Sequence, residues 1–310
     1  MRFLKAIVFL YIFCLFDVNR DEEKAYDIVY LINLDSSPDR LVKMKTQLDA
    51  FGIKFVRFKA VDGTKLKIVN LKTNEVIEDA KTFDASKKFE DGLEYKVSSG
   101  DFSIKYRTDS KFIKRYISYG ELGCAMSHYA IMKDIIKNRY KRAIVFEDDI
   151  VFEKDFNENL ELIMANVQHD FDILFLDVGI CGEAITQNVS KEKIKSIIYI
   201  PDPDRLLRSF EQVPNNEYIV KISEKNILYG THAYCISLAG AKKMILLTDS
   251  VTLPIDEQMF HNNALTRYVS KKKMLYISED TSTLEKGRGF SGNKNTICYT
   301  RIEKNKNLEK

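Results

Sequence analysis

Three acidic residues directly follow an apolar segment of the chain. Glu147, Asp148 and Asp149 come after residues 142–146, whose sequence RAIVF is typical of a buried strand. Carboxylates this close repel one another, and burial beside a sheet core adds a desolvation cost. A divalent cation such as Mg²⁺ or Mn²⁺ removes both penalties, because it prefers carboxylate and phosphate oxygens. The cluster therefore indicates a metal site, and a helix cap or a solvated turn is the alternative interpretation.

The spacing within the cluster indicates which carboxylates act together. In an extended segment, side chains two residues apart point to the same side of the backbone. Glu147 and Asp149 are therefore the predicted metal ligands. Asp148 is expected to face the backbone or the hydroxyl groups of a bound sugar.

The segments around the cluster alternate between strand and helix patterns. Residues 26–34 form an apolar, β-branched run, and Ser37 and Pro38 then begin a helix that ends at Gly52. A second strand at 53–61 completes a unit whose short connection makes the two strands parallel. Further strands are expected at 142–146, 171–176, 230–237 and 274–277, and further helices at 120–136, 156–167, 240–247 and just after Pro254. This alternation predicts a single α/β domain with a mostly parallel sheet flanked by helices.

The expected domain covers residues 25–290, with irregular insertions at about 62–117 and 182–226, and a charged tail follows at 291–310. Residues 1–24 have a different character, because a basic start precedes an apolar run at 6–16. That run is shorter than the ~20 residues that a membrane-spanning helix needs. A secretory signal, a shallow membrane anchor and a first buried strand are the three interpretations. A membrane-associated or secretory location is expected, at the cytoplasmic face of the inner membrane if the chain is bacterial and uncleaved.

Composition limits the classes of partner. The 48 basic and 45 acidic side chains give a formal net charge of +3 and are spread along the chain, so a nucleic-acid partner is not expected. Lysine-rich stretches such as 271–273 indicate a solvated face, with peripheral membrane contact as the alternative. The five cysteines include no CxxC pair, so their spacing indicates neither a disulfide scaffold nor a zinc site.

Polar side chains also follow the other predicted strands. Asn33 and Arg40 follow the first strand, Asp62 follows the second, and Asp177 follows residues 171–176. In open α/β sheets, ligands bind beyond the carboxyl ends of the strands. These residues are therefore expected to share a binding site with the acidic cluster.

Six short motifs occur in order along the chain: YLINL at 30–34 with Arg40, AVDG at 60–63, GELGC at 120–124 running into Ser127 and His128, VFEDD at 145–149, GTHAY at 230–234, and PID at 254–256. This order resembles glycosyltransferase family 25, which includes bacterial lipooligosaccharide and animal collagen galactosyltransferases. The resemblance spans about 27–260 and implies a GT-A fold, which is Rossmann-like, with a UDP-sugar donor, Mn²⁺ or Mg²⁺, and inversion at the anomeric carbon. The cluster reads Glu-Asp-Asp where many metal-dependent transferases have Asp-x-Asp, so the set of ligand carboxylates stays open.

The resemblance also implies roles for single residues. Asp256, in the Pro-Ile-Asp motif, is expected to act as the general base on the acceptor hydroxyl, with Asp177 and Glu183 as its rivals and a helix cap as its alternative role. His232 is expected to be a third metal ligand or an acceptor contact. The donor is expected to contact Asn33, Arg40, Asp62, Glu121, His128 and Asp148. Glu121 has the alternative of a favourable first-turn acid, and His128 that of a hydrogen-bonded, half-buried histidine.

These observations predict a metal-dependent inverting glycosyltransferase with a UDP-sugar donor. The transferred sugar is expected to be a hexose, namely galactose. The acceptor is expected to be a glycan or glycolipid, namely lipooligosaccharide or lipopolysaccharide. The alternatives are a non-catalytic secreted or membrane-attached glycan-binding protein with the same fold, and a collagen-type protein galactosyltransferase. A nucleotidyltransferase ranks last, because residues 33–40 contain no glycine with which to form a phosphate loop.

Overall fold

The computed structural model describes residues 25–83, 89–111, 116–168, 170–176, 210–223, 230–247 and 250–277. Four features expected from the sequence fall wholly or mostly outside these ranges. They are the leader at 1–24, Asp177, the insertion at 182–226 apart from residues 210–223, and the tail at 291–310.

A central sheet of eight strands forms the middle layer, in the order β10-β11-β13-β9-β12-β7-β1-β2. The strands are β1 (Ile28–Asn33), β2 (Val56–Lys59), β7 (Arg142–Glu147), β9 (Ile173–Phe175), β10 (Glu211–Gln212), β11 (Ile219–Lys221), β12 (Ala233–Ser237) and β13 (Arg267–Ser270). β2, β1 and β7 are parallel neighbours, as predicted for the first two. β12 runs antiparallel to both β7 and β9, so the sheet is mixed beyond its parallel centre.

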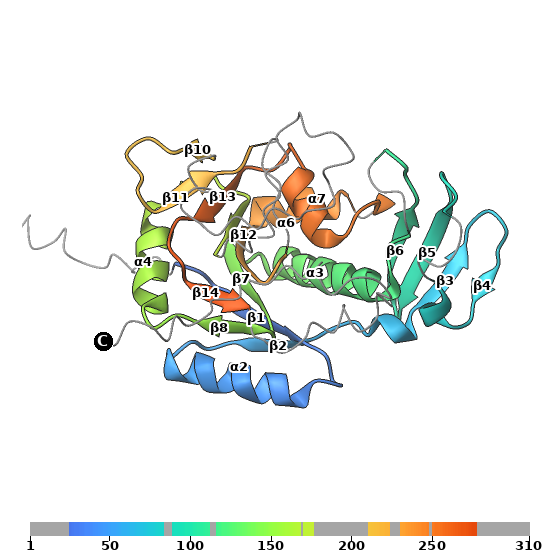
Figure 1. Cartoon of the computed structure of the whole chain (residues 1–310), viewed down its shortest axis with the longest axis horizontal. Helices are drawn as coiled ribbons and strands as arrows, with labels where there is room; N and C mark the ends of the chain where they lie inside the picture. The colour runs from blue at the N-terminus through green and yellow to red at the C-terminus, as the bar shows by residue number, and fades with distance from the viewer. Residues whose placement is uncertain are drawn as a thin grey trace, which may run out of the picture.

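Helices cover both faces of this sheet (Figure 1). They are α2 (Pro38–Ala50), α3 (Tyr119–Asn138), α4 (Phe156–Asn166), α6 (Leu238–Ile245) and α7 (Ile255–His261). Alternate residues of β1 belong to different cores: Tyr30 and Ile32 pack with α3, whereas Val29 and Leu31 pack with α2 and α4. The predicted single α/β domain is therefore confirmed. Within the described residues, no helix has the length and apolar character needed to cross a membrane.

Local signals explain where the two helices nearest the site begin. Pro38 occupies the first turn of α2, where its missing N–H costs nothing. The start of α3 is a capping box, in which the Ser118 hydroxyl accepts from the Glu121 amide and the Glu121 carboxylate accepts from the Ser118 amide. Such an N-cap contributes about 1 kcal/mol to helix stability. Both helices are thus fixed close to the carboxyl edge of β1 and β7.

A short turn carries the acidic cluster from β7 into β8 (Ile150–Phe152), which pairs antiparallel with β14 (Leu275–Ile277). Aromatic side chains hold both sides of the turn. The ring centroids of Phe146 and Phe152 lie 5.1 Å apart, and those of Phe152 and Phe156 lie 4.5 Å apart. Each such pair adds about 0.5–1.5 kcal/mol beyond the area it buries. The two acids of the turn therefore sit on a rigid support.

An accessory sheet occupies the region where irregular structure was expected. It comprises β3 (Lys67–Asn70), β4 (Val76–Ile77), β5 (Glu94–Ser99) and β6 (Phe102–Arg107), in the order β4-β3-β5-β6. Its inner face buries Ile68, Tyr95, Val97, Ile104 and Tyr106 in the core shared with α3. Two 3₁₀ turns, η1 (Gly63–Lys65) and η2 (Ala80–Thr82), flank β3 and β4.

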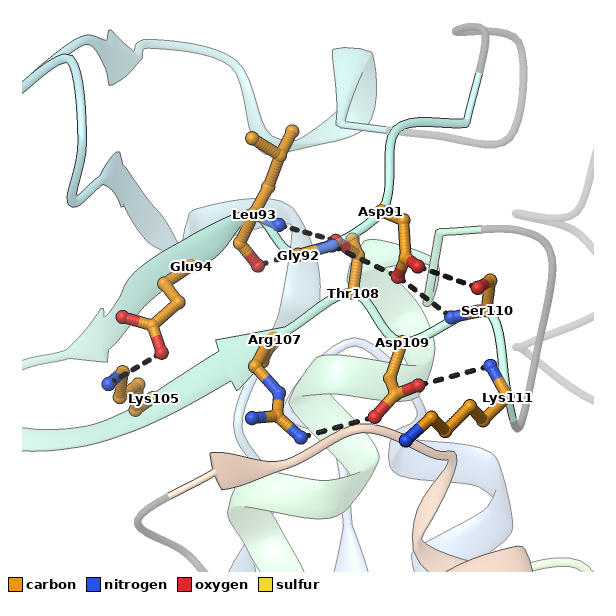
Figure 2. A network of polar contacts seen from close by, with 10 residues as sticks. All are labelled: Asp91, Gly92, Leu93, Glu94, Lys105, Arg107, Thr108, Asp109, Ser110 and Lys111. Atoms are coloured by element: carbon orange, nitrogen blue, oxygen red, sulfur yellow. Dashed lines mark hydrogen bonds and ion pairs between the residues drawn. The ribbon is translucent and has the colours of Figure 1, made fainter.

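Polar contacts close the far end of the accessory sheet (Figure 2). Asp91 accepts from the Ser110 hydroxyl at 2.6 Å and from its amide at 2.9 Å. These hydrogen bonds lower the pKa of Asp91. The Gly92 amide donates to the Thr108 carbonyl at 3.0 Å, which ties the start of β5 to the end of β6. This end of the sheet is a structural region that contributes no residue to the cavities described below.

Candidate active site

Two adjoining cavities open at the carboxyl edge of β1 and β7. The larger cavity has a volume of about 280 Å³ and is lined by Ile32, Asn33, Leu34, Ser36, Arg40, Val61, Asp62, Gly63, Thr64, Tyr119, Gly120, Cys124, Ser127, His128, Glu147, Asp148 and Asp149. The smaller cavity, of about 80 Å³, is lined by Glu121, Cys124, Glu147, Asp149, Gly230, Thr231, His232, Pro254, Ile255 and Asp256. Cys124, Glu147 and Asp149 line both, so they form the boundary between the two spaces.

Glu147 ends β7 and is held on several sides. Its amide donates to the His232 carbonyl at 2.9 Å, and its Oε1 accepts from the Thr231 hydroxyl at 2.5 Å. His128 Nε2 lies 3.3 Å from the same oxygen. Burial raises the pKa of Glu147, but the contacts with His128, His232 and Thr231 outweigh it and lower the pKa to about 2. Glu147 is therefore a carboxylate at neutral pH.

His128 is fully buried on α3 and lies behind Glu147. Its Nδ1 is 2.8 Å from the Tyr234 hydroxyl. Burial raises the pKa of Tyr234 well above its usual range, so the phenol keeps its proton. The other ring nitrogen, Nε2, faces the Glu147 carboxylate. This geometry makes His128 a positioning residue for Glu147 on the wall of the larger cavity.

Asp149 and His232 lie on the other side of Glu147. His232 Nδ1 is 3.5 Å from Asp149 Oδ1 and 4.0 Å from Glu147 Oε2. Asp149 is only 7% exposed, and among the described residues its buried Oδ1 accepts no hydrogen bond. A buried carboxylate oxygen without a donor is costly unless a cation occupies the space beside it.

The three residues fit a divalent cation. Ligand atoms of Glu147, Asp149 and His232 all lie within 4.8 Å of one another. Two carboxylates and one imidazole form a donor set that Mn²⁺ accepts, and the bordering cavities leave room for phosphate oxygens. The structure thus brings together the three residues that the sequence suggested as metal ligands.

Asp148 points into a separate network. Its Oδ2 accepts from Asn33 Nδ2 at 2.5 Å, and its Oδ1 pairs with the Arg40 guanidinium at 3.0 Å. Burial raises the pKa of Asp148 despite these two donors. Asn33 Nδ2 also donates to the Ser37 carbonyl at 2.9 Å, which ties the network to the start of α2. Three of the residues expected to bind the donor therefore lie together on the wall of the larger cavity.

Asp62 lies on the opposite wall of the larger cavity, at the start of η1. Its side chain accepts from the amide and hydroxyl of Thr64, at 3.0 and 2.6 Å. Burial raises the pKa of Asp62, but the hydrogen bonds from Thr64 and Lys65 outweigh it, so the pKa is lowered. Gly63 packs so closely on α3 that a Cβ there would lie 2.2 Å from the Tyr119 carbonyl oxygen. This close approach fixes Asp62 against the start of α3.

Asp256 lies in the first turn of α7 and faces the smaller cavity. The Gly230 amide donates to its Oδ2 at 3.0 Å, and no hydrogen bond to Oδ1 is recorded within the described residues. Gly230 has φ +89°, and a Cβ there would lie 2.4 Å from His232 Nε2. Gly230 therefore lets Asp256 and His232 approach the same boundary.

Glu121 also lines the smaller cavity, although its carboxylate takes part in the capping box of α3. Glu121 was expected to contact the donor, whereas the structure places it on the smaller cavity and not among the lining residues of the larger one. Asp177 and Glu183, the rival bases, lie outside the described residues.

Three residues of this site had no expected role. Thr231 supports Glu147, Tyr234 orients His128, and Cys124 lines both cavities. Thr231 and Tyr234 flank His232 in the GTHAY motif, which was the only signal available for them. Their roles depend on the antiparallel pairing of β12 with β7, in which Ala233 lies opposite Phe146.

Comparison with known proteins identifies the family of the chain. Residues 27–259 match the model of glycosyltransferase family 25, described as an LPS biosynthesis protein. The chain belongs to glycosyltransferase family 25. The family predicted from the order of the six motifs is therefore confirmed, and so is the prediction that the chain is a glycosyltransferase.

Several curated relatives of this family 25 chain are animal proteins. Human procollagen galactosyltransferase 2 is 25% identical over 266 residues, which cover 84% of the chain and 34% of that protein. A glycosyltransferase 25 family member of Anopheles gambiae is 27% identical, covering 76% and 32%. Human inactive glycosyltransferase 25 family member 3 is 25% identical, covering 77% and 33%. The chain thus spans about a third of the length of the curated relatives it matches.

Proposed function

We propose that this chain is a divalent-cation-dependent glycosyltransferase that transfers galactose from a UDP-sugar to a glycan hydroxyl with inversion. The observation that carries the proposal is the buried Asp149 Oδ1, which accepts no hydrogen bond among the described residues and lies beside Glu147 and His232. Family membership supplies the class of reaction, and relatives named as galactosyltransferases favour galactose.

The larger cavity is suited to the nucleotide diphosphate. Arg40 supplies a guanidinium whose planar donors match phosphate oxygens. The amino-terminus of α3, at Tyr119 and Gly120, lines the same cavity and places the positive end of a helix dipole there. Glu147, Asp149 and His232 would hold the cation at the boundary. When bound, the cation supplies positive charge that stabilises the departing diphosphate.

The smaller cavity is suited to the acceptor. Inversion requires one displacement, in which the acceptor oxygen forms a bond to the anomeric carbon as the bond to the β-phosphate oxygen breaks. The hydroxyl proton passes to Asp256, and the bonding electron pair leaves with UDP. The Gly230 amide fixes Asp256 Oδ2, which leaves Oδ1 for that proton.

Lipooligosaccharide or lipopolysaccharide is the proposed acceptor, because the family description names LPS biosynthesis. A collagen-type protein acceptor is the alternative, favoured by the procollagen galactosyltransferase relatives. A glycolipid acceptor and a collagen peptide should therefore be compared with the same donor and cation.

A non-catalytic glycan-binding protein is the second candidate, because one matching human relative is named as inactive. Such a protein would bind glycans equally well with and without UDP and cation. Isothermal calorimetry with glycans, with and without UDP and Mn²⁺, separates the two candidates.

The direct test is UDP release by the purified chain with Mn²⁺, a panel of UDP-sugars and each acceptor. We expect turnover with UDP-galactose, a loss of turnover in chelator and its return when Mn²⁺ is added back. Asp155→Asn is a matched control for Asp149→Asn, because Asp155 is an exposed acid six residues further along. Absence of turnover with every donor, in protein shown to be folded, would contradict the proposal.

A further inference from the structure

Cys124 and His128 form a second potential ligand group with Glu147. The two residues are one helical turn apart on α3, so their side chains share a face of the helix. Ligand atoms of Cys124, His128 and Glu147 all lie within 4.8 Å of one another. A thiol, an imidazole and a carboxylate are the donor types that zinc takes in sites with three protein ligands.

The two oxygens of Glu147 face different groups. Oε1 lies 3.3 Å from His128 Nε2, whereas Oε2 lies 4.0 Å from His232 Nδ1. The Glu147 carboxylate thus belongs to two potential ligand groups, one with Cys124 and His128 and the other with Asp149 and His232. Soft thiolate ligands select Zn²⁺ and related ions, whereas carboxylates with phosphate oxygens suit Mn²⁺ or Mg²⁺.

We propose that Cys124, His128 and Glu147 form a second cation site, selective for thiophilic divalent ions such as Zn²⁺. Occupation of this site draws Glu147 away from Asp149 and His232. Zn²⁺ therefore competes with Mn²⁺ for the chain. The binding itself is independent of the proposed function, whereas its consequence, inhibition of transfer, rests on that function.

Burial and the neighbouring carboxylates raise the pKa of the Cys124 thiol, so the bound ion must displace its proton, but access and outer-shell contacts suit this role. Cys124 lines both cavities, so an ion can reach it from either one. The Tyr234 hydroxyl contacts His128 Nδ1 at 2.8 Å, which is the outer-shell contact that orients a metal-ligating histidine. The Thr231 hydroxyl would keep its hydrogen bond to Glu147.

Binding requires the loss of one proton at Cys124 and one defined tautomer at His128. The thiol loses its proton to solvent as the sulfur bonds the ion. His128 binds through Nε2 and carries its proton on Nδ1, from which it donates to the Tyr234 oxygen. The His128–Glu147 contact is replaced by two bonds to the same cation, so no buried polar group of the trio loses a partner.

Cobalt binding to the full-length chain tests the site, because a thiolate bonded to Co²⁺ gives a near-ultraviolet charge-transfer band. We expect one equivalent of Co²⁺ to produce this band and Zn²⁺ to abolish it. Cys124→Ser should lose the band, whereas Cys235→Ala, at the buried cysteine of β12, should keep it. Replacement of Cys14, Cys181 and Cys298 in turn should also leave the band in place.

Calorimetry adds a readout that does not depend on activity. Zn²⁺ affinity should fall at least about 100-fold in Cys124→Ser, because loss of outer-shell partners alone changes metal affinity by about 10- to 100-fold. The Zn²⁺ affinity of Tyr234→Phe should fall by an amount within that about 10- to 100-fold range. The Mn²⁺ affinity of Cys124→Ser should stay within about threefold of the wild type. If Cys124→Ser is poorly folded, the loss of Zn²⁺ affinity in Tyr234→Phe and the thiolate band of Co²⁺ in the wild type carry the test.

Two outcomes separate this inference from the proposed function. A band that survives in Cys124→Ser, or Zn²⁺ that leaves Mn²⁺ affinity unchanged, overturns the second site and leaves the transferase proposal intact. A Cys124-dependent band in a folded chain that turns over no UDP-sugar supports the site and contradicts the transferase proposal.

Discussion

The two cavities share a boundary but differ in their cationic groups. The larger one contains Arg40 and the start of α3 beside Asp62 and the acidic cluster, whereas the described lining of the smaller one contains Glu121 and Asp256 but no lysine or arginine. The positive groups that favour an anionic diphosphate therefore lie in the larger cavity, where a cation at the boundary would offset the shared carboxylates. An acceptor hydroxyl that must lose a proton is favoured in the smaller cavity, because Asp256 can accept that proton there. This contrast favours the proposal that the donor binds in the larger cavity and that the acceptor is activated in the smaller one.

Asp256→Asn should give the largest effect specific to one cavity. Removal of a general base lowers kcat by about 10²- to 10⁴-fold. UDP affinity should stay within about twofold, because Asp256 does not line the larger cavity. Steady-state kinetics and UDP calorimetry on the same preparation make the comparison. Equal losses in kcat and in UDP affinity would break the division between the cavities.

Arg40→Ala should affect the larger cavity alone. Loss of a hydrogen bond to a charged group costs about 1.5–3 kcal/mol, which is about 10- to 150-fold in donor affinity. Loss of the partner of Asp148 adds to this effect. The acceptor KM should not change. Lys45→Ala is the matched control, because Lys45 is an exposed cation of the same helix that pairs with Asp49. A changed acceptor KM with unchanged donor affinity would reverse the assignment.

Gly230→Ala should act on the boundary itself. The new Cβ would displace His232, and we expect Mn²⁺ affinity to fall about tenfold, the lower end of the range for altered metal surroundings. Gly92→Ala is the matched control, since Gly92 has φ +72° and a Cβ there meets nothing within 4 Å. Both variants should lose about 1 kcal/mol of unfolding free energy from the left-handed backbone. Equal Mn²⁺ affinities in the two variants would show that His232 does not hold the cation.

Glu121→Gln should give the smallest effect. Glutamine preserves the capping box, so the helix start is retained while one negative charge leaves the smaller cavity. Discrimination against anionic acceptors should relax about 5-fold, the effect of ~1 kcal/mol of like-charge repulsion when water fills the space between the two charges. Glu158→Gln, in the first turn of α4, is the control. Unchanged acceptor preference would remove Glu121 from the acceptor-binding role.

The long elements of the fold could be read from the sequence because their periodicity is strong. The apolar run of β1, the Ser37-Pro38 start of α2 and the repeat of α3 each predicted an element within a few residues of its observed bounds. The three-residue strand β8 was not predicted, since three residues carry no period. The accessory sheet was expected as loops and minor strands, because charged residues interrupt its alternation.

The site could be predicted where it depends on neighbours in sequence. Alternation of side chains was enough to pair Glu147 with Asp149 and to separate Asp148 from them. Contacts across the sheet were not predictable in the same way. Thr231 meets Glu147 and Tyr234 meets His128 only because β12 pairs with β7 in one register, and no local pattern fixes that register.

The most direct test of the central claim is the Mn²⁺ dependence of UDP affinity in the double variant Glu147→Gln with Asp149→Asn, measured by calorimetry beside the wild type and Asp155→Asn. We expect Mn²⁺ to strengthen UDP binding in the wild type and in Asp155→Asn, and to have no effect in the double variant. A folded double variant in which Mn²⁺ still strengthens UDP binding as it does in the wild type would contradict the account.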